Sequence, residues 1–180
     1  MDTIREETRP ALVGGEVDLP FLLQRSPRLN AVFDEVMRLT NSSSSIRRAT
    51  SDVRIGRFQL HPGPNVLIPY RQLHFNEKVF GDDAQVFNPW RFLENRSLNR
   101  SSSYRPFGGG TTYCPGRFIA RQEVLAFIAI AINRHIITLA EAKGDECFPA
   151  LEEKKPCLGV MGPVNGDDII IKITKKEKVI

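Results

Sequence analysis

Apolar residues in the segment RSPRLNAVFDEVMRL recur with the spacing of an α-helix. This pattern predicts a helix within residues 19–40, with Ser26 as its N-cap and Pro27 at its first helical position. Glu35 and Arg38 fall about 60° apart at the edge of the apolar face, so both can point at whatever the helix packs on. The apolar face follows the i, i+3, i+4, i+7 rule and consists of Leu29, Val32, Phe33, Val36 and Leu39.

Shorter apolar segments follow this helix. Residues 53–70 contain DVRIGRFQL and NVLIPY, separated by the turn sequence HPGP, which predicts a β-hairpin. Residues 71–106 are polar and rich in turn formers. Aromatic residues within that stretch favour a loop packed on a core over a flexible linker; they are Phe80, Phe87, Trp90 and Phe92.

Residues 107–135 comprise a glycine-rich loop and then a helix. That helix is apolar almost all round between residues 124 and 132, which predicts burial on most of its sides. Its apolar run is shorter than the about 20 residues that a membrane span needs, so no span is expected. Residues 136–180 end in the turn GPVNGDD and the strand IIIKIT. The predicted fold class is mainly α with a small β region (α+β), in a single domain.

Composition and charge exclude several classes of protein. The net charge of +4 is too weak to indicate a nucleic-acid partner. The opening residues MDTIREETRP lack the apolar stretch of a secretory signal, and the three cysteines form neither a disulfide framework nor a CxxC pair. A reducing compartment is therefore expected, with Cys147 and Cys157 as structural thiols.

Cys114 differs from the other two cysteines in its surroundings, RPFGGGTTYCPGRF. Glycines allow the backbone to adopt positive φ or to approach a flat object closely. The residue lies at or just before the N-terminus of the predicted helix, where peptide dipoles and free N–H groups favour a thiolate. From these residues alone, Cys114 is a candidate metal ligand or a candidate nucleophile.

The cysteine segment fits the pattern F-x-x-G-x-x-x-C-x-G, through Phe107, Gly110, Cys114 and Gly116. There it resembles the heme-binding loop of the cytochromes P-450. A ten-residue pattern with four fixed residues can occur by chance, so independent motifs are needed to assign the family.

Two further motifs agree with this family in order and spacing. The sequence EVMR, from Glu35 to Arg38, matches the family's E-x-x-R pair, and FNPWRF, which contains Arg91, matches its F-x-P-x-R-F segment. The chain is therefore identified as a member of this family. It resembles the C-terminal part of the family's fold, as one partial domain over residues 1–180. The segments EVMRLTNSSSSIR and CPGRFIA most resemble the branch of sterol 7α-hydroxylases, prostacyclin synthase and related fungal enzymes.

The resemblance implies a role for the matched loop residues. Cys114 would be the axial thiolate ligand of the iron of heme b, and Phe107 would pack beside its sulfur and exclude water. Glycines would let the backbone press against the porphyrin and aim amides at the sulfur; they are Gly108, Gly109, Gly110 and Gly116.

The resemblance also implies two sets of supporting charges. Glu35, Arg38 and Arg91 would form a buried structural cluster that locks the helix to the packed loop, with no catalytic role. Arg47 would pair with a heme propionate. The other cations considered for that role are Arg48, His74 and Arg105.

The chain departs from the family pattern in two respects. Thr112 stands two residues before the cysteine, where most members carry an arginine or histidine that donates to a propionate, so heme binding is expected to depend more on Arg47. The family's central helix with A/G-G-x-D/E-T has no match, so no catalytic residue is assigned. Its N-terminal anchor, which typically holds members on the endoplasmic reticulum membrane facing the cytosol, has no match either.

Three functions are compatible with the sequence. A heme-thiolate monooxygenase would insert one oxygen atom of O₂ into a lipophilic substrate, with electrons from NADPH through a flavoprotein reductase that Arg117 and Arg121 would attract. A heme-thiolate isomerase or dehydratase would need no reductase. A truncated, non-catalytic fragment that binds heme loosely, or that folds only with another chain, is the third. The resemblance implies that residues 157–162 form a turn that often contacts substrate in this family. Leu158, Val160 and Met161 make that turn apolar, so a lipophilic substrate is expected.

Overall fold

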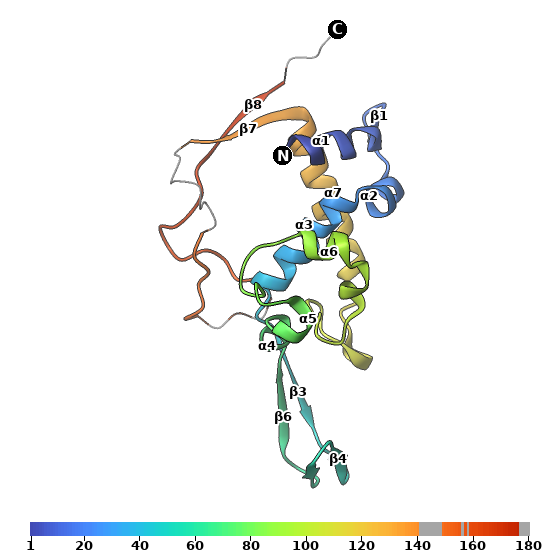
Figure 1. Cartoon of the computed structure of the whole chain (residues 1–180), viewed down its shortest axis with the longest axis vertical. Coiled ribbons are helices and arrows are strands. Elements are labelled where there is room, and N and C mark those ends of the chain that lie inside the picture. Colours follow the sequence, from blue (N-terminus) through green and yellow to red (C-terminus); the bar gives the residue numbers. More distant parts are fainter. Residues whose placement is uncertain (141–148, 156, 158, 177–180) are drawn as a thin grey trace.

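The computed structural model describes residues 1–140, 149–155, 157 and 159–176. Its helices gather in one body, and strands β3 and β6 extend from one end of that body as a long ribbon (Figure 1). The predicted fold class, mainly α with a small β region, is confirmed. The helices are α1 (Asp2–Thr8), α2 (Leu19–Arg25), α3 (Pro27–Thr40), α4 (Tyr70–His74), α5 (Glu77–Phe80), α6 (Trp90–Glu94) and α7 (Arg117–Arg134), with 3₁₀ helices at Arg9–Ala11, Arg96–Arg100 and Gly110–Thr112.

Helix α3 begins where the sequence predicts, at Pro27 directly after Ser26. The Ser26 hydroxyl accepts no capping bond and has no hydrogen-bond partner among the described residues, whereas the Ser26 carbonyl accepts the Asn30 amide at 3.0 Å. The helix buries charged as well as apolar side chains, namely Leu29, Ala31, Phe33, Asp34, Glu35, Arg38 and Leu39. Its neighbours must therefore supply partners for those charges, because an unpaired buried charge is costly.

The strands form antiparallel pairs: β1 (Leu12–Val13) with β2 (Glu16–Val17), β3 (Ser44–Arg48) with β6 (Asn65–Pro69), β4 (Val53–Ile55) with β5 (Phe58–Leu60), and β7 (His135–Leu139) with β8 (Ile171–Lys175). The predicted pairing within residues 53–70 is wrong. Strands β4 and β5 pair with each other across Gly56, whose φ of +59° suits a tight turn, and β6 pairs with β3. The sequence carries two turn signals here, and local pattern does not specify which segments pair across them.

Residues 71–106 are packed on the helical body rather than forming a flexible linker. Phe80, Phe92 and Tyr104 form a buried cluster with Ala31 of α3, and the Phe92 and Tyr104 rings meet edge to face with centroids 5.3 Å apart. Trp90 does not join them, because it is 58% exposed. This cluster holds the segment that precedes Cys114 against α3.

Helix α7 is less buried than its apolar sequence predicts. Leu125 and Ala129 are fully buried in a cluster with residues of α2 and α3, but Phe118, Ile119 and Phe127 are each more than 60% exposed. The prediction of burial on most sides is wrong for the described residues, because these supply packing partners along one side of the helix only. In the described part of the chain, no helix combines the length and the apolar character that crossing a membrane requires.

Strand β7 follows α7 directly and pairs with β8, which contains most of the predicted strand IIIKIT. Ile137 lies opposite Ile173 in this pair. Cys147 lies outside the described residues, so its expected structural role stays a prediction.

Candidate functional site

The Cys114 loop connects the packed segment to helix α7. The Cys114 amide donates to the Phe107 carbonyl at 3.1 Å, which closes the loop around the 3₁₀ helix Gly110–Thr112. Gly108 and Gly110 have φ of +82° and +69°, in the left-handed region that glycine adopts without strain. Helix α7 begins three residues after the cysteine, as the sequence predicts.

The thiol of Cys114 is exposed beside open space. A Cβ at Gly110 would meet no atom within 4 Å, and a Cβ at Gly116 would lie 3.7 Å from the Cys114 sulfur. Phe107 is half-buried and packs against the cluster formed by α2, α3 and α7. The loop therefore presents an accessible sulfur on a surface that glycines keep clear of side chains.

Arg47 reaches this loop from strand β3. Its Nη2 donates to the Thr112 hydroxyl, and its Nη1 donates to the Ile46 carbonyl at 3.0 Å. Thr112, the departure from the family pattern, thus holds a guanidinium beside the cysteine loop. Arg48 is exposed and, as the next residue along the strand, points to the opposite face.

Glu35, Arg38 and Arg91 come together in the interior. Arg38 binds Glu35 through two hydrogen bonds of 2.8 Å, and the Arg91 Nε donates to the same carboxylate at 3.2 Å. The Asn88 amide is a further donor at 2.8 Å. The side chains of Glu35 and Arg38 are fully buried. The cluster thus fastens α3 to the segment that leads to the cysteine loop.

The suggested propionate role of His74 is wrong. The His74 ring is fully buried: its Nδ1 lies 3.0 Å from the Arg38 carbonyl, and its Nε2 accepts the Arg105 amide at 2.9 Å. Burial lowers the pKa of His74 to about 4, so the ring is neutral at pH 7. It links the buried charge cluster to the segment before Cys114 instead. The Arg105 side chain lies at Gly109, where an added Cβ would be 3.5 Å from its Cδ.

Arg117 and Arg121 were expected to attract a reductase, but both have partners within the chain. Arg121 forms an ion pair with Asp34 and donates to the Asn30 side chain at 2.9 Å. The Arg117 guanidinium donates to the Cys114 carbonyl at 2.8 Å and lies against the ring of Phe118. Arg121 is thereby a packing residue, because its charge is compensated, and Arg117 supports the cysteine loop.

Sequence reasoning missed Asn41, which is almost fully buried and donates from its side chain to the Pro106 carbonyl at 2.7 Å. This bond fixes the end of α3 to the start of the cysteine loop. The residue directly follows the last turn of the predicted helix. A polar amide side chain at a helix end was the only hint of a structural role in the sequence, and it could not identify a partner that lies 65 residues away along the chain.

The apolar turn at residues 157–162 is only partly available to a ligand. Met161 is buried, and its amide donates to the Thr40 carbonyl at 2.8 Å. Val160 is 52% exposed, Cys157 is half-buried, and Leu158 lies outside the described residues.

Comparisons with known proteins agree with this geometry. The cytochrome P450 family model matches residues 1–151, and the chain belongs to this family. Cytochrome P450 714B2 of Oryza sativa subsp. japonica is 30% identical over 140 residues, which cover 77% of this chain and 26% of the rice protein. Cytochrome P450 monooxygenase poxD of Penicillium oxalicum is 29% identical over 131 residues, which cover 69% of this chain and 27% of the fungal protein.

A solved structure extends the agreement to three dimensions. Retinoic acid-bound cyanobacterial CYP120A1 superimposes with a TM-score of 0.75 at 24% identity, over 97% of this chain and 38% of that protein. The chain spans about a quarter of the length of these curated relatives. The suggested branch of sterol 7α-hydroxylases and prostacyclin synthase stays a prediction.

The family implies a heme b cofactor, and the residues present fit it. An exposed thiol on a glycine-lined loop before a helix suits a thiolate ligand of iron. The position of Gly110 leaves room for a flat ring, and a guanidinium stands at the edge of the loop for a carboxylate. When bound, heme supplies the redox chemistry of its iron, and the thiolate tunes it.

Proposed function

We propose that this chain is the heme-ligating part of a cytochrome P450 monooxygenase, which transfers one oxygen atom of O₂ to a lipophilic substrate. The observation that carries the proposal is the exposed Cys114 thiol on its glycine-lined loop, in a chain that belongs to the family. Electrons would come from NADPH through a flavoprotein reductase. The name of the Penicillium relative, a monooxygenase, supports this class.

In this proposal each residue of the site has one task. Cys114 ligates the iron, and Phe107 would help to exclude water from its sulfur when heme is bound. Gly108, Gly110 and Gly116 keep the loop surface free of side chains. Arg47 pairs with a propionate, while the buried cluster of Glu35, Arg38 and Arg91 maintains the shape of the loop.

Complete turnover is expected to need more of the family's fold than these residues provide. The chain spans about a quarter of its relatives, and α7 exposes Phe118, Ile119 and Phe127. Substrate binding needs an apolar, water-excluding enclosure, and the described residues place no such enclosure around the Cys114 thiol.

Electron delivery tests the proposed function. The heme-loaded chain is mixed with a flavoprotein reductase under carbon monoxide, and NADPH is added without any chemical reductant. We expect the absorption band of the ferrous carbon monoxide complex to appear on addition of NADPH. A chain that dithionite reduces but the reductase does not would contradict coupling to a reductase.

Heme affinity tests the role assigned to Arg47. Replacing Arg47 by glutamine removes a cation beside the loop, and we expect the Kd for heme to rise about tenfold or more, since a charge-assisted hydrogen bond contributes about 1.5–3 kcal/mol. The measurement is a fluorescence-quenching titration with heme. Arg48→Gln is the matched control, because it removes the same charge from the opposite face of β3. Equal weakening by both changes would contradict a specific role.

A further inference from the structure

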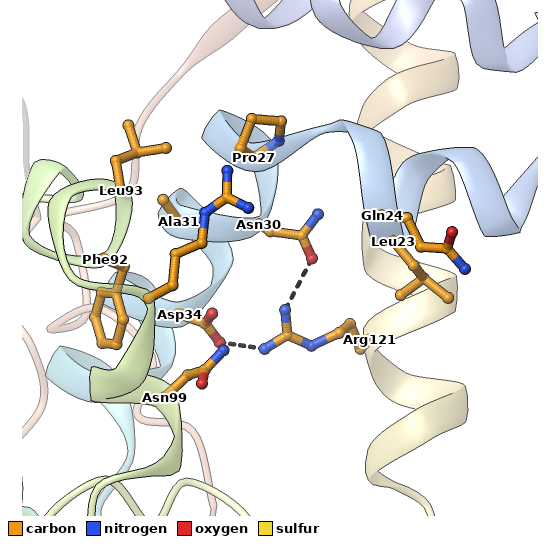
Figure 2. Close-up of a pocket in the computed structure, with 11 residues that line it drawn as sticks. Leu23, Gln24, Pro27, Asn30, Ala31, Asp34, Phe92, Leu93, Asn99 and Arg121 are labelled. Carbon is orange, nitrogen blue, oxygen red and sulfur yellow. Dashed lines mark hydrogen bonds and ion pairs between the residues drawn. The ribbon is translucent and has the colours of Figure 1, made fainter.

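A pocket unrelated to the cysteine loop lies where α2, α3, α6 and α7 approach one another (Figure 2). Its volume is about 220 Å³, and no residue of the Cys114 loop lines it. Five of the side chains around it carry nitrogen donors: Gln24, Asn30, Arg96, Asn99 and Arg121. Asp34 is the acidic residue among those that line it.

The charge of Asp34 is already used within the protein. Its Oδ1 accepts hydrogen bonds from Arg121 and, at 2.9 Å, from the Tyr104 hydroxyl. Figure 2 shows Arg121 lying between Asp34 and Asn30, with its guanidinium bound to both. These contacts fix the position of one guanidinium on the pocket wall and offset its charge with that of Asp34.

Other donors of the wall have no such partner. In the part of the chain that the structure describes, the side chains of Arg96, Asn99 and Gln24 are exposed and form no hydrogen bond or ion pair with the protein, and all three line the pocket. Arg96 therefore adds a positive charge that nothing described here compensates. With Asp34 and Arg121 offsetting each other, the wall as a whole carries one net positive charge.

The rest of the wall is apolar. Leu23 and Ala31 come from α2 and α3, and Phe92 and Leu93 come from α6. Arginine side chains bind phosphate with two parallel hydrogen bonds, and neighbouring amides can complete the set of donors. An apolar wall favours a ligand that also carries a small hydrocarbon group.

We propose that this pocket binds a small phosphate monoester, with its phosphate at Arg96 and Asn99 and its hydrocarbon group against Leu93. The site is separate from the proposed heme function and does not depend on it. Among residues 1–140, none of the pocket donors is shared with the Cys114 loop.

The test is isothermal titration calorimetry of the full chain with phenyl phosphate, and in parallel with inorganic phosphate and with benzoate. We expect phenyl phosphate to bind most tightly, and Arg96→Gln to weaken it about tenfold or more, because a charged hydrogen bond is lost. Arg100→Gln is the matched control: it removes the same charge from the same 3₁₀ helix but does not line the pocket.

Three results would overturn the proposal. Phenyl phosphate that does not bind would exclude the site, and equal weakening by Arg96→Gln and Arg100→Gln would indicate attraction to net charge only. Benzoate that binds more tightly than phenyl phosphate would exclude the phosphate assignment. Circular dichroism of both variants establishes that they are folded, and their heme titrations are expected to match the parent chain.

Discussion

Replacing Glu35 by alanine is expected to lower the free energy of unfolding by about 3–5 kcal/mol, because it leaves the fully buried Arg38 without its counterion. Arg38 would lose both of its 2.8 Å bonds to the carboxylate, and Arg91 would lose its bond of 3.2 Å. Domains of this size have about 5–15 kcal/mol of stability in total, so the loss would be a large fraction of it. Urea unfolding followed by circular dichroism measures the effect.

Glu153→Ala provides the control for this experiment. Glu153 also forms an ion pair with an arginine, Arg71, but its side chain is 61% exposed. Exposed pairs contribute about 0–1 kcal/mol, because water screens them and replaces the lost partner. A similar loss for Glu35→Ala and Glu153→Ala would contradict a structural role for the buried cluster.

Acidification from pH 7.5 to pH 4.5 is expected to cost about 2–3 kcal/mol of stability through His74 alone. Burial lowers its pKa from the ordinary 6.5 to about 4 in the folded protein. Between these values the unfolded chain binds more protons than the folded chain, so stability falls as the pH falls through that window. The measurement is urea unfolding at both pH values.

His74→Gln separates this contribution from those of other titrating groups. Glutamine can form hydrogen bonds but does not titrate, so the variant is expected to lose about 2–3 kcal/mol less than the parent chain between the two pH values. The same pH dependence in both proteins would show that His74 is not buried as a neutral ring.

The predictable parts of the site are those that a local sequence pattern specifies. The glycines around Cys114 and the helix after it are a local pattern, and the structure places the thiol just before α7 as expected. Glu35 and Arg38 lie one helical turn apart, so their shared face also follows from spacing alone. Arg91 could be joined to them only through the family resemblance, since it is 56 residues from Glu35.

The parts that were not predictable depend on partners distant in the chain. From the sequence, Arg121 is expected to be an ordinary surface residue. In the structure its guanidinium forms an ion pair with Asp34, which lies 87 residues before it. His74 is one of three histidines without a metal-site spacing, and only the fold shows that its ring is enclosed between α3 and the segment before Cys114. Strand β6 had two possible partners, and the alternation of its residues does not choose between them.

The exposure of α7 has the same origin. An apolar sequence predicts burial only when neighbouring elements are present to cover it. Leu125 and Ala129 have such neighbours in α2 and α3, whereas Phe118 and Phe127 stay more than 60% exposed. The pattern thus predicted the chemical character of the helix correctly, but not its surroundings.

The central claim is that Cys114 is the heme ligand, and the most direct test is the absorption spectrum of the purified chain with heme, reduced under carbon monoxide. We expect a strongly red-shifted Soret band in the parent chain and in Cys157→Ser, which alters another free thiol. The same band should be absent from Cys114→Ala. An unshifted band in all three proteins, or a red-shifted band that persists in Cys114→Ala, would contradict the assignment.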